Sequence, residues 1–401
     1  MYGTQTRREW MLRTASGLSG AYLAGSSPGR AAQAPTAPVS LARCKTYDSS
    51  ELVPTLAKMF DQIGGLGRLV KGKTVAMKIN LGAPVGYRLG YLPLEETNFS
   101  HPAVIAATVH LMAKAGARRI RVLESPWSTA DPLEEQMLQA NWEPRDILNA
   151  APDVEFENTN YLGNATKYTR MTVPYGGYIF PAFDLNHSYH DCDMFVSLCK
   201  MKEHVTAGVT LSMKNCFGLT PATIYGGSAG VDEPSETPKG GRSLIHLGNR
   251  QPSKSAPPEK DPKSPRQETY RVPRVVVDLI ATRPVDLAIV EGIKTMTGGE
   301  GPWIPGVAAV SPGVLLVGGN PVTTDAVAMA VMGFDPMGDR GTPPFEDCDS
   351  MLKLAEDVGI GTRDLKRIEV VGTPITDAVF DFAAIRKKRR LTTPQFVPKR
   401  G

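Results

Sequence analysis

The chain has 401 residues, of which 41% are hydrophobic and 21% are charged, and its formal net charge is +4 at pH 7. These values are ordinary for a globular protein, and the length suffices for one large hydrophobic core or two smaller ones. No apolar run approaches the roughly 18 residues that a membrane-spanning helix needs. The composition therefore indicates a globular protein without a conventional membrane span.

Residues 1–34 resemble an export signal. Arg7 and Arg8 precede a weakly hydrophobic stretch over residues 15–24, and small residues suited to a signal peptidase follow at positions 32–34. This pattern is typical of a twin-arginine signal peptide. We therefore expect the twin-arginine translocation machinery as a partner and a periplasmic or extracellular location. The alternative is an ordinary N-terminus whose paired arginines arose by chance.

A basic tail is predicted at the other end of the chain, over residues 386–401. It contains seven basic residues and no acidic one. Such a cluster can contact an anionic surface such as lipid headgroups, although a solvated tail is the commoner outcome. Nucleic acid is not an expected partner, because no aromatic residues are interleaved with the basic run and the protein is predicted to be exported.

The cysteines do not form a metal-binding frame. The chain has five of them and no C-x-x-C motif: Cys44, Cys192, Cys199, Cys216 and Cys348. A zinc ribbon and a cysteine-bound iron–sulfur cluster are therefore not expected. We expect mostly buried free thiols, with one or two disulfides of undetermined pairing as the alternative.

Short apolar runs alternate along the chain with helical stretches, which is typical of a mostly parallel sheet covered by helices on both faces. The predicted strands are 39–44, 75–80, 120–124, 154–157, 194–199, 285–291, 314–317 and 368–371, with a hairpin formed by 169–173 and 178–180. The predicted helices are 51–63, 102–115, 132–142, 205–217, 275–281, 321–332 and 345–358. We therefore predict a single three-layer α/β domain over residues 35–385. A long irregular insertion rich in proline, at about 221–273, interrupts it.

Polar side chains follow several of these strands at their carboxyl ends, where open α/β sheets bind ligands. Lys200, Lys202 and His204 project from one face if the strand stays extended, because side chains alternate along a strand. Ammonium groups in such a row favour a carboxylate or phosphate ligand. The candidate substrate-binding residues are Lys78, Asn80, His101, Lys200 and Asn215. The candidate catalytic residues are Lys202, His204 and Lys214, with His204 exchanging protons near neutral pH.

Three carboxylates at or just beyond strand ends, Glu124, Glu291 and Asp325, are candidate ligands for a hard divalent cation such as Mg²⁺. Each candidate also has a structural interpretation. Glu124 and Glu291 can be paired with lysines, Asp325 can favour the positive end of a helix, and His204 can be a satisfied core histidine. Their common position at strand ends favours a functional site.

Residues 298–302 form a glycine-rich stretch, Gly-Gly-Glu-Gly-Pro, that lacks the lysine frame of a phosphate-binding loop. We expect it to be a loop lining the pocket. The G-x-S-x-G, H-E-x-x-H and G-x-G-x-x-G motifs are missing from the expected contexts, which disfavours serine hydrolases, zincins and dinucleotide-binding proteins.

Several of these segments together resemble the domain of unknown function 362 family, over roughly Lys73 to Gly333. They are Lys78-Ile79-Asn80, Ser100-His101-Pro102, residues 199–204, residues 208–218, Glu291-Gly292, residues 299–302 and residues 320–328, and His246 corresponds to a histidine after the Lys-Asn motif. The resemblance implies no specific activity, because none is generally established for the family. Many members carry iron–sulfur cysteine motifs, and this chain lacks them.

Three functional hypotheses follow. The leading one is an enzyme acting on a small anionic molecule, with a divalent metal as an optional cofactor. The second is a non-catalytic ligand-binding or assembly protein that uses the same groove. The third is a structural role in which the lysines and carboxylates are only paired charges.

Overall fold

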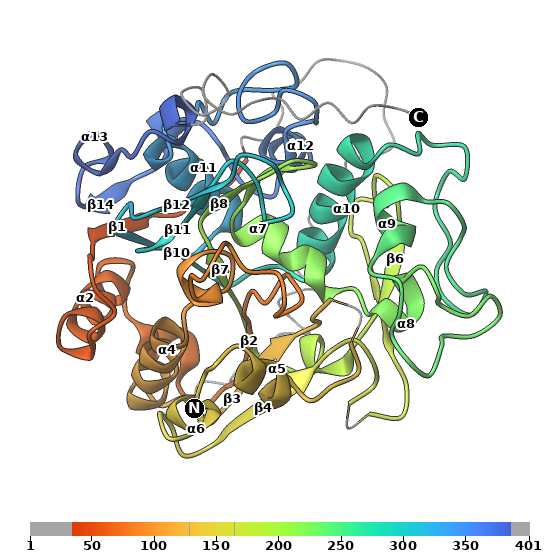
Figure 1. The fold of residues 1–401 in the computed structure, drawn as a ribbon, viewed down its shortest axis with the longest axis horizontal. Coiled ribbons are helices and arrows are strands. Elements are labelled where there is room, and N and C mark those ends of the chain that lie inside the picture. The colour runs from red at the N-terminus through yellow and green to blue at the C-terminus, as the bar shows by residue number, and fades with distance from the viewer. Residues whose placement is uncertain (1–33, 128, 164, 386–401) are drawn as a thin grey trace, which may run out of the picture. The chain divides into compact units, whose positions relative to one another are not determined.

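The computed structural model describes residues 34–127, 129–163 and 165–385, which form an eight-stranded sheet with the order β14-β1-β13-β10-β7-β2-β3-β4 (Figure 1). Only β13 runs against the other seven strands, because it pairs antiparallel with both β1 and β10. The strands are β1 (Val39–Arg43), β2 (Thr74–Lys78), β3 (Arg119–Glu124), β4 (Val154–Asn158), β7 (Met194–Lys200), β10 (Leu287–Gly292), β13 (Val314–Gly318) and β14 (Val370–Gly372). The predicted mostly parallel α/β sheet is confirmed.

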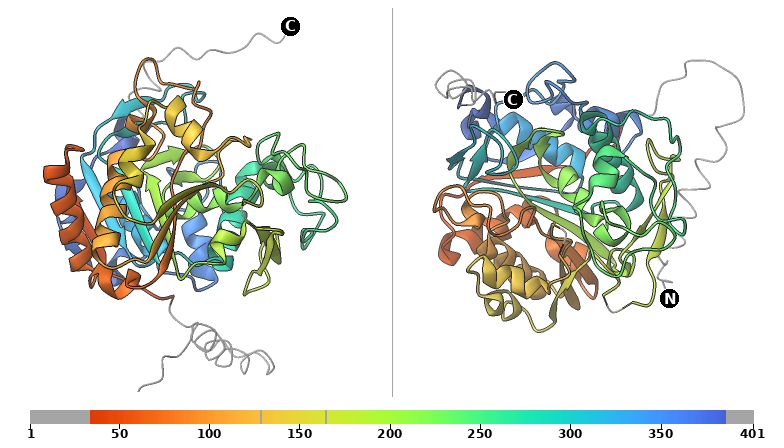
Figure 2. Two further views of the ribbon diagram at one scale, coloured as in Figure 1. Left: turned by 90° about the horizontal axis from the view of Figure 1, so that it is seen from below. Right: turned by 45° about the vertical axis from the view of Figure 1, so that its right-hand side comes forward.

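Helices cover both faces of the sheet, which gives three layers (Figure 2). One face carries α2 (Ser49–Gln62), α3 (Leu66–Val70), α4 (Pro102–Lys114), α5 (Leu133–Gln139) and α6 (Pro144–Leu148). The other carries α7 (Ser212–Asn215), α10 (Glu268–Thr282), α11 (Pro321–Val331), α12 (Met351–Asp357) and α13 (Ile375–Ala378). In β2, Val75 and Met77 pack toward the first group while Ala76 packs toward the second, as strand alternation requires.

Two short antiparallel hairpins extend the chain beyond the carboxyl ends of the sheet strands. β8 (Lys202–His204) pairs with β9 (Gly208–Thr210), and β11 (Thr295–Thr297) pairs with β12 (Ala308–Val310). These two hairpins directly follow the central strands β7 and β10, so they continue the chain beyond the strand ends where the polar residues gather.

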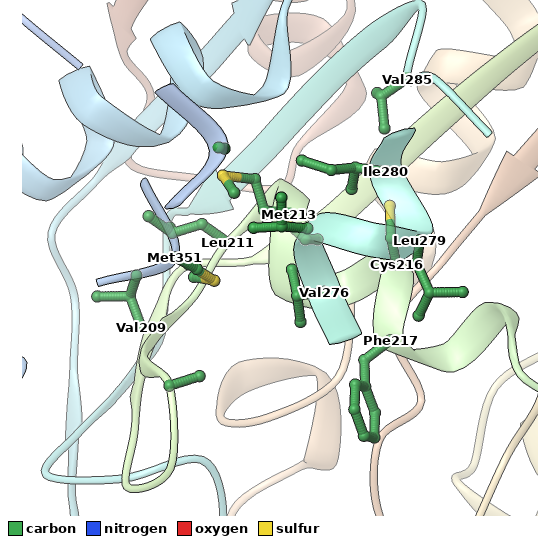
Figure 3. Packing of buried hydrophobic residues seen from close by; sticks show 14 of the residues in the cluster. Val209, Leu211, Met213, Cys216, Phe217, Val276, Leu279, Ile280, Val285 and Met351 are labelled. Carbon is green, nitrogen blue, oxygen red and sulfur yellow. The ribbon is translucent and has the colours of Figure 1, made fainter. Parts of the chain in front are cut away.

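The helix predicted over residues 205–217 is wrong for most of its length. Residues 208–210 form β9, and Gly208 adopts a left-handed φ of 76° that interrupts a helix. Leu211 is still extended, and α7 begins only at Ser212. Met213 of α7 nevertheless packs against α10, close to Val276 (Figure 3). Lys214 and Asn215 therefore do lie on a helix.

The second strand of the predicted hairpin is also misplaced, because β5 (Thr169–Thr172) pairs with β6 (Ala182–Leu185) rather than with residues 178–180. The buried Asp278 carboxylate accepts hydrogen bonds from the backbone N–H groups of Tyr178, Ile179 and Phe180 at 2.6, 2.8 and 3.0 Å. These amides are therefore not available for a strand ladder.

Helix α10 begins five residues before Pro273, whereas we predicted its start at residue 275. A proline inside a helix leaves the carbonyl four residues earlier without its usual donor. Here that carbonyl, on Thr269, accepts from the Asp349 N–H at 3.3 Å and from the Arg340 guanidinium at 3.2 Å. The tertiary fold therefore compensates for the proline. By contrast, α12 is shorter than the predicted helix over 345–358.

Residues 221–267 contain only the short helices α8 (Ala222–Tyr225) and α9 (Ser243–Leu247), as their composition suggests. This irregular insertion is nevertheless attached to the rest of the domain, because a buried ion-pair cluster ties it to α10. Glu259 pairs with Arg266 at 2.6 Å and with the fully buried Arg271 at 2.5 Å. The segment therefore packs as part of the fold.

Two sequence predictions fall largely or wholly on residues outside the described part of the chain. These are the signal peptide over residues 1–34, of which only Ala34 is described, and the basic tail over residues 386–401. Within the described part, no helix is both long and apolar enough to cross a membrane. All five cysteines are free thiols, and only Cys192 is not buried.

Candidate functional site

Lys78 and Glu124 form a closed ion pair at the carboxyl ends of β2 and β3. The Lys78 ammonium donates to Glu124 Oε1 at 2.7 Å, to Asn215 Oδ1 at 3.1 Å and to the Ile79 carbonyl at 2.7 Å, which uses all three of its hydrogens. Gly218 is required here, because a Cβ at this position would lie 2.7 Å from Lys78 Cε. Both charged side chains are almost completely buried, so this pair has a structural role.

Lys200 and Glu291 form a second closed pair, at the ends of β7 and β10. The Lys200 ammonium also donates to the carbonyls of Glu95 at 2.7 Å and Lys294 at 3.0 Å. The Tyr47 hydroxyl donates to the other oxygen of Glu291 at 2.8 Å. Because every hydrogen of this ammonium has a partner, Lys200 is not available to a ligand without breaking the network.

Lys202 has a different environment, although it follows Lys200 by only two residues. Its ammonium donates to the Asn98 carbonyl at 2.7 Å and to Asn80 Oδ1 at 3.3 Å, both of them neutral oxygens. Burial lowers the pKa of Lys202 to about 7, opposed by Glu300 and assisted by the neighbouring Lys200 and Lys214. Lys202 is 3% exposed and has no carboxylate ion pair among the described residues.

Lys214 lies on α7 and is also without a carboxylate partner in the described part of the chain. Its ammonium rests over the Phe217 ring, 4.4 Å from the ring centroid, as a cation–π contact. Burial lowers the pKa of Lys214 to about 7, with Arg242 and Lys78 contributing and Glu300 opposing. Unlike Lys202, this side chain is only partly buried.

Two histidines border these lysines and stay uncharged. The His204 ring contacts the N–H and the hydroxyl of Thr206 at 3.2 Å, and its pKa lies well below 6.5 because of burial and of Lys214 nearby. His246, on α9, packs against Phe217 with 4.7 Å between ring centroids, and burial lowers its pKa to about 3. Proton exchange by His204 near neutral pH is therefore not supported, and the lysines are the groups that titrate there.

The glycine-rich stretch 298–302 borders this region through Glu300. Glu300 accepts from the Val205 N–H at 3.1 Å and from the Trp303 indole N–H at 3.2 Å. The stretch is tied to β8, because Glu203 accepts from the Thr297 hydroxyl at 2.6 Å and from the Gly298 N–H at 2.5 Å. Glu300 thus places a negative charge close to two unpaired lysines.

The two asparagines among the predicted substrate-binding residues lie inside the same network. Asn215 is buried, accepts from Lys78 and Asn80, and donates to the Ser197 hydroxyl at 3.0 Å. Asn80 links this group to Lys202. They position the lysines and have little surface left for a ligand.

His101 lies elsewhere, in the Lys200 network. Its ring stacks on Tyr47 with 3.4 Å between centroids, and Nδ1 caps α4 by accepting from the Ala103 N–H at 3.1 Å. Burial and the nearby Lys200 and Lys294 lower the pKa of His101 to about 3. The sequence placed this residue correctly at a helix start but did not reveal that its ring is occupied there.

The three predicted metal ligands occupy three separate environments. Glu124 and Glu291 pair with different lysines. The strands that carry these two carboxylates, β3 and β10, lie three positions apart in the sheet, which is about 14 Å at the usual strand spacing. Asp325 accepts from the Ser212 N–H, the Ser212 hydroxyl and the Met213 N–H at 2.7–2.9 Å, so it caps α7. The described residues contain no group of three or more His, Cys, Asp or Glu side chains suited to a metal ion.

Several residues that complete the site were missed from the sequence. Arg242 belongs to the irregular segment 221–267, whose composition gave no sign that it returns to the sheet, whereas His246 of the same segment was indicated only by the family resemblance. Asn98 and Thr210 each leave one buried side-chain polar atom, Nδ2 and Oγ1, without a hydrogen-bond partner in the described structure. Thr210 pairs directly with Lys202 across the β8–β9 hairpin, so the two side chains share a face.

These features define an α/β protein with a buried, lysine-rich polar site at the carboxyl ends of its central strands. The chain belongs to the family described as "Domain of unknown function (DUF362)", whose model matches residues 75–330. This span includes every candidate site residue, and it confirms the family resemblance seen in the sequence.

A thylakoid-associated protein of Synechocystis sp. is 28% identical over 192 residues, which are 46% of this chain and 51% of the relative. The chain therefore spans about half the length of the curated relative it matches. Among solved structures, the lactate racemase apoprotein of Thermoanaerobacterium thermosaccharolyticum aligns with a TM-score of 0.35 and 11% identity, over 69% of this chain and 54% of that one. A Thermotoga maritima protein aligns with a TM-score of 0.34 and 12% identity, over 67% and 55% of the two chains.

Proposed function

We propose that this protein binds a small anionic molecule, a carboxylate or a phosphate, between Lys202 and Lys214 and acts on it as an enzyme. The observation that carries the proposal is the contrast among the four lysines. Lys78 and Lys200 each form an ion pair with a carboxylate, whereas Lys202 and Lys214 form none in the described residues. A buried or partly buried ammonium without a counter-charge destabilises the fold, so two of them that also repel each other favour a function over a structural role.

The proposed chemistry is proton transfer by the lysines. A general acid or base works best when its pKa lies near the operating pH, and the pKa of both Lys202 and Lys214 is about 7. The protonated form attracts an anion and the neutral form accepts a proton. His204 and His246, which are neutral at this pH, supply polar surface without adding positive charge.

Export and a surface contact belong to the same proposal. Residues 1–34 resemble a twin-arginine signal, which supports a periplasmic or extracellular site of action. The cyanobacterial relative is named for an association with thylakoids, and the basic residues of 386–401 suit an anionic lipid surface. We leave Mg²⁺ out of the proposal, because each carboxylate predicted to bind it is already engaged by a lysine or by the start of α7.

Calorimetric titration tests the binding step, with inorganic phosphate and malonate as probes at pH 7. We expect the wild-type protein to bind at least one probe, and Lys202→Met and Lys214→Met to weaken that binding about tenfold or more, which is about 1.4 kcal/mol. Lys254→Met is the matched control, since Lys254 is exposed and pairs with Asp232 at 2.7 Å. Equal binding by all variants would contradict the proposed site.

A mixture of metabolites incubated with the protein and followed by mass spectrometry tests the catalytic step. Consumption of an anionic compound by the wild type, but not by Lys202→Met, is the result expected of an enzyme. Tight binding with no consumption of any compound would instead assign the protein to the non-catalytic binding class.

A further inference from the structure

We propose that Lys214 is a nucleophile that forms an imine with a small aldehyde or ketone carrying a carboxylate or phosphate group. This inference rests on the proposed anion site and names its substrate class. Of the four lysines at the carboxyl ends of the strands, Lys214 alone has no hydrogen bond or ion pair among the described residues. It is also the one whose side chain is partly open to solvent.

The amine of Lys214 is supported by an aromatic ring and has no hydrogen-bond partner among the described residues. The Phe217 ring supports it at 4.4 Å, and a ring face offers no lone pair that would bind the amine's hydrogens strongly. The position of α7 itself is fixed by Asp325, which caps the Ser212 and Met213 N–H groups. A nucleophile needs this combination, because an amine saturated with acceptors, such as that of Lys78, has no electron pair to offer.

The surroundings of Lys214 are dominated by positive and neutral groups. The charged and titratable groups that interact with it are Lys78, Glu124, Lys202, His204, Arg242, His246, Glu268 and Glu300. Glu124 is already neutralised by Lys78, so Glu300 is the nearby carboxylate that opposes deprotonation of Lys214 most strongly. With its pKa at about 7, roughly half of the amine is neutral at pH 7. An ordinary exposed lysine is neutral only to about one part in 10³ at this pH.

The step balances without any further reactant. The lone pair of Lys214 Nζ attacks the carbonyl carbon and the C=O π electrons move to oxygen, giving a carbinolamine. The C–O bond then breaks as the C=N bond forms, and both amine hydrogens leave with the carbonyl oxygen as water. The anionic group of the substrate is bound by Lys202, and Arg242 adds positive charge near Lys214.

Reductive trapping tests the inference on the unmodified protein. The probe is glyoxylate, an aldehyde with a carboxylate, with cyanoborohydride added at pH 7 to reduce any imine to a stable carboxymethyl amine. Peptide mass spectrometry then locates the modified lysines. We expect Lys214 to be carboxymethylated at least about tenfold faster than exposed Lys254, because of its larger neutral fraction. Labelling of Lys214 no faster than that of Lys254 would overturn the inference.

Two further measurements separate this inference from the proposed function. Lys214→Arg keeps the positive charge but cannot form an imine, so its digest should lack the fast-labelled peptide. Phosphate should slow the labelling of Lys214 in the wild type, because both occupy the anion site. If phosphate binds and protects Lys202 while Lys214 is not labelled fast, the imine is overturned and the anion site stands. If phosphate does not bind at all, the proposed function itself fails.

Discussion

At the scale of single residues, the central finding is that four lysines with similar sequence positions have two different roles. Lys78 and Lys200 end strands β2 and β7 and are closed by Glu124 and Glu291. Lys202 lies just beyond β7 and contacts only neutral oxygens. The sequence correctly indicated that these residues gather at one edge. It could not show which lysine meets which carboxylate, because the partners are 46 and 91 positions apart in the chain.

Lys202→Met is expected to stabilise the protein while it weakens anion binding. The folded-state pKa of Lys202, about 7, lies below its unfolded value, so the unfolded chain binds more protons between pH 7 and about 10.4 and stability rises with pH there. The loss of stability caused by burying the charged Lys202 ammonium is therefore complete below pH 7 and decreases above it. We expect the variant to gain a few kcal/mol at pH 6 and much less at pH 10, measured by urea unfolding. A loss of stability at pH 6 would contradict this expectation.

Lys78→Met is expected to have the opposite effect. It leaves Glu124 buried without its counter-charge, and breaking a buried pair in this way typically costs about 3–5 kcal/mol. The double variant Lys78→Met/Glu124→Gln should recover part of this loss, because the remaining side chain is neutral. Urea unfolding of both variants checks the prediction, and equal stability of the single variant and the wild type would show that the pair is not coupled.

At the scale of elements, the site depends on α7, a helix of four residues that cannot be stable alone. The helix is placed by Asp325 from α11 and by apolar packing against α10. The sequence predicted the long strands and helices because their apolar periodicity is strong. It failed at residues 205–217, where Val205, Val209 and Met213 repeat with helical spacing although Gly208 bends the backbone into a hairpin.

Asp325→Ala is expected to lower anion affinity although Asp325 does not contact the proposed ligand site. The change removes three hydrogen bonds from the start of α7, so Lys214 loses its fixed position. Removing a cap of this kind costs about 1–2 kcal/mol, and leaving the buried N–H groups unpaired adds to that. Calorimetric titration with phosphate, run beside thermal unfolding, should show weaker binding in a protein that still folds. Unchanged affinity would show that α7 does not need this cap.

The Asp325 carboxyl also makes the stability of the protein depend on pH. Burial raises the pKa of Asp325 to about 7, above its unfolded value, so the folded state binds the extra proton between about pH 4 and 7. The stability that this carboxyl contributes is complete below pH 4 and is lost as the pH rises through 7. We expect Asp325→Ala to remove this downward slope, which unfolding at pH 5 and pH 8 would reveal; an unaltered slope would assign it to another group.

At the scale of the whole molecule, the predicted destination of the protein can be tested independently of its chemistry. Twin-arginine machinery recognises the arginine pair itself, so Arg7→Lys/Arg8→Lys should keep the charge and still block export. Cell fractionation and immunoblotting in a bacterial host that has this machinery would show the variant retained in the cytoplasm and the wild type exported. Equal export of both would favour the alternative that the arginines arose by chance.

The sequence predicted the fold class, but it did not predict which residues of segment 221–267 reach the site. Nearly continuous apolar strands such as Val75–Lys78 and Met194–Cys199 are strong signals of a covered sheet. The segment 221–267 carries no such signal, since its few buried apolar residues, among them Leu244 and Ile245, do not recur with a strand or helix period. Arg242 was therefore not predicted at the site, and His246 was indicated only by the family resemblance.

The attachment of that segment through Glu259 has a consequence for how readily proteases cut the protein. Proline- and serine-rich stretches are normally the first places where proteases cut, because an unstructured backbone fits their active-site clefts. Here the ion pair between Glu259 and Arg271 ties residues 221–267 to α10, and Arg266 of the segment itself pairs with the same carboxylate, so cleavage would require this cluster to open first. A protein with such a stretch can thus resist proteases for longer, and that resistance would depend on the acidic side chain of Glu259.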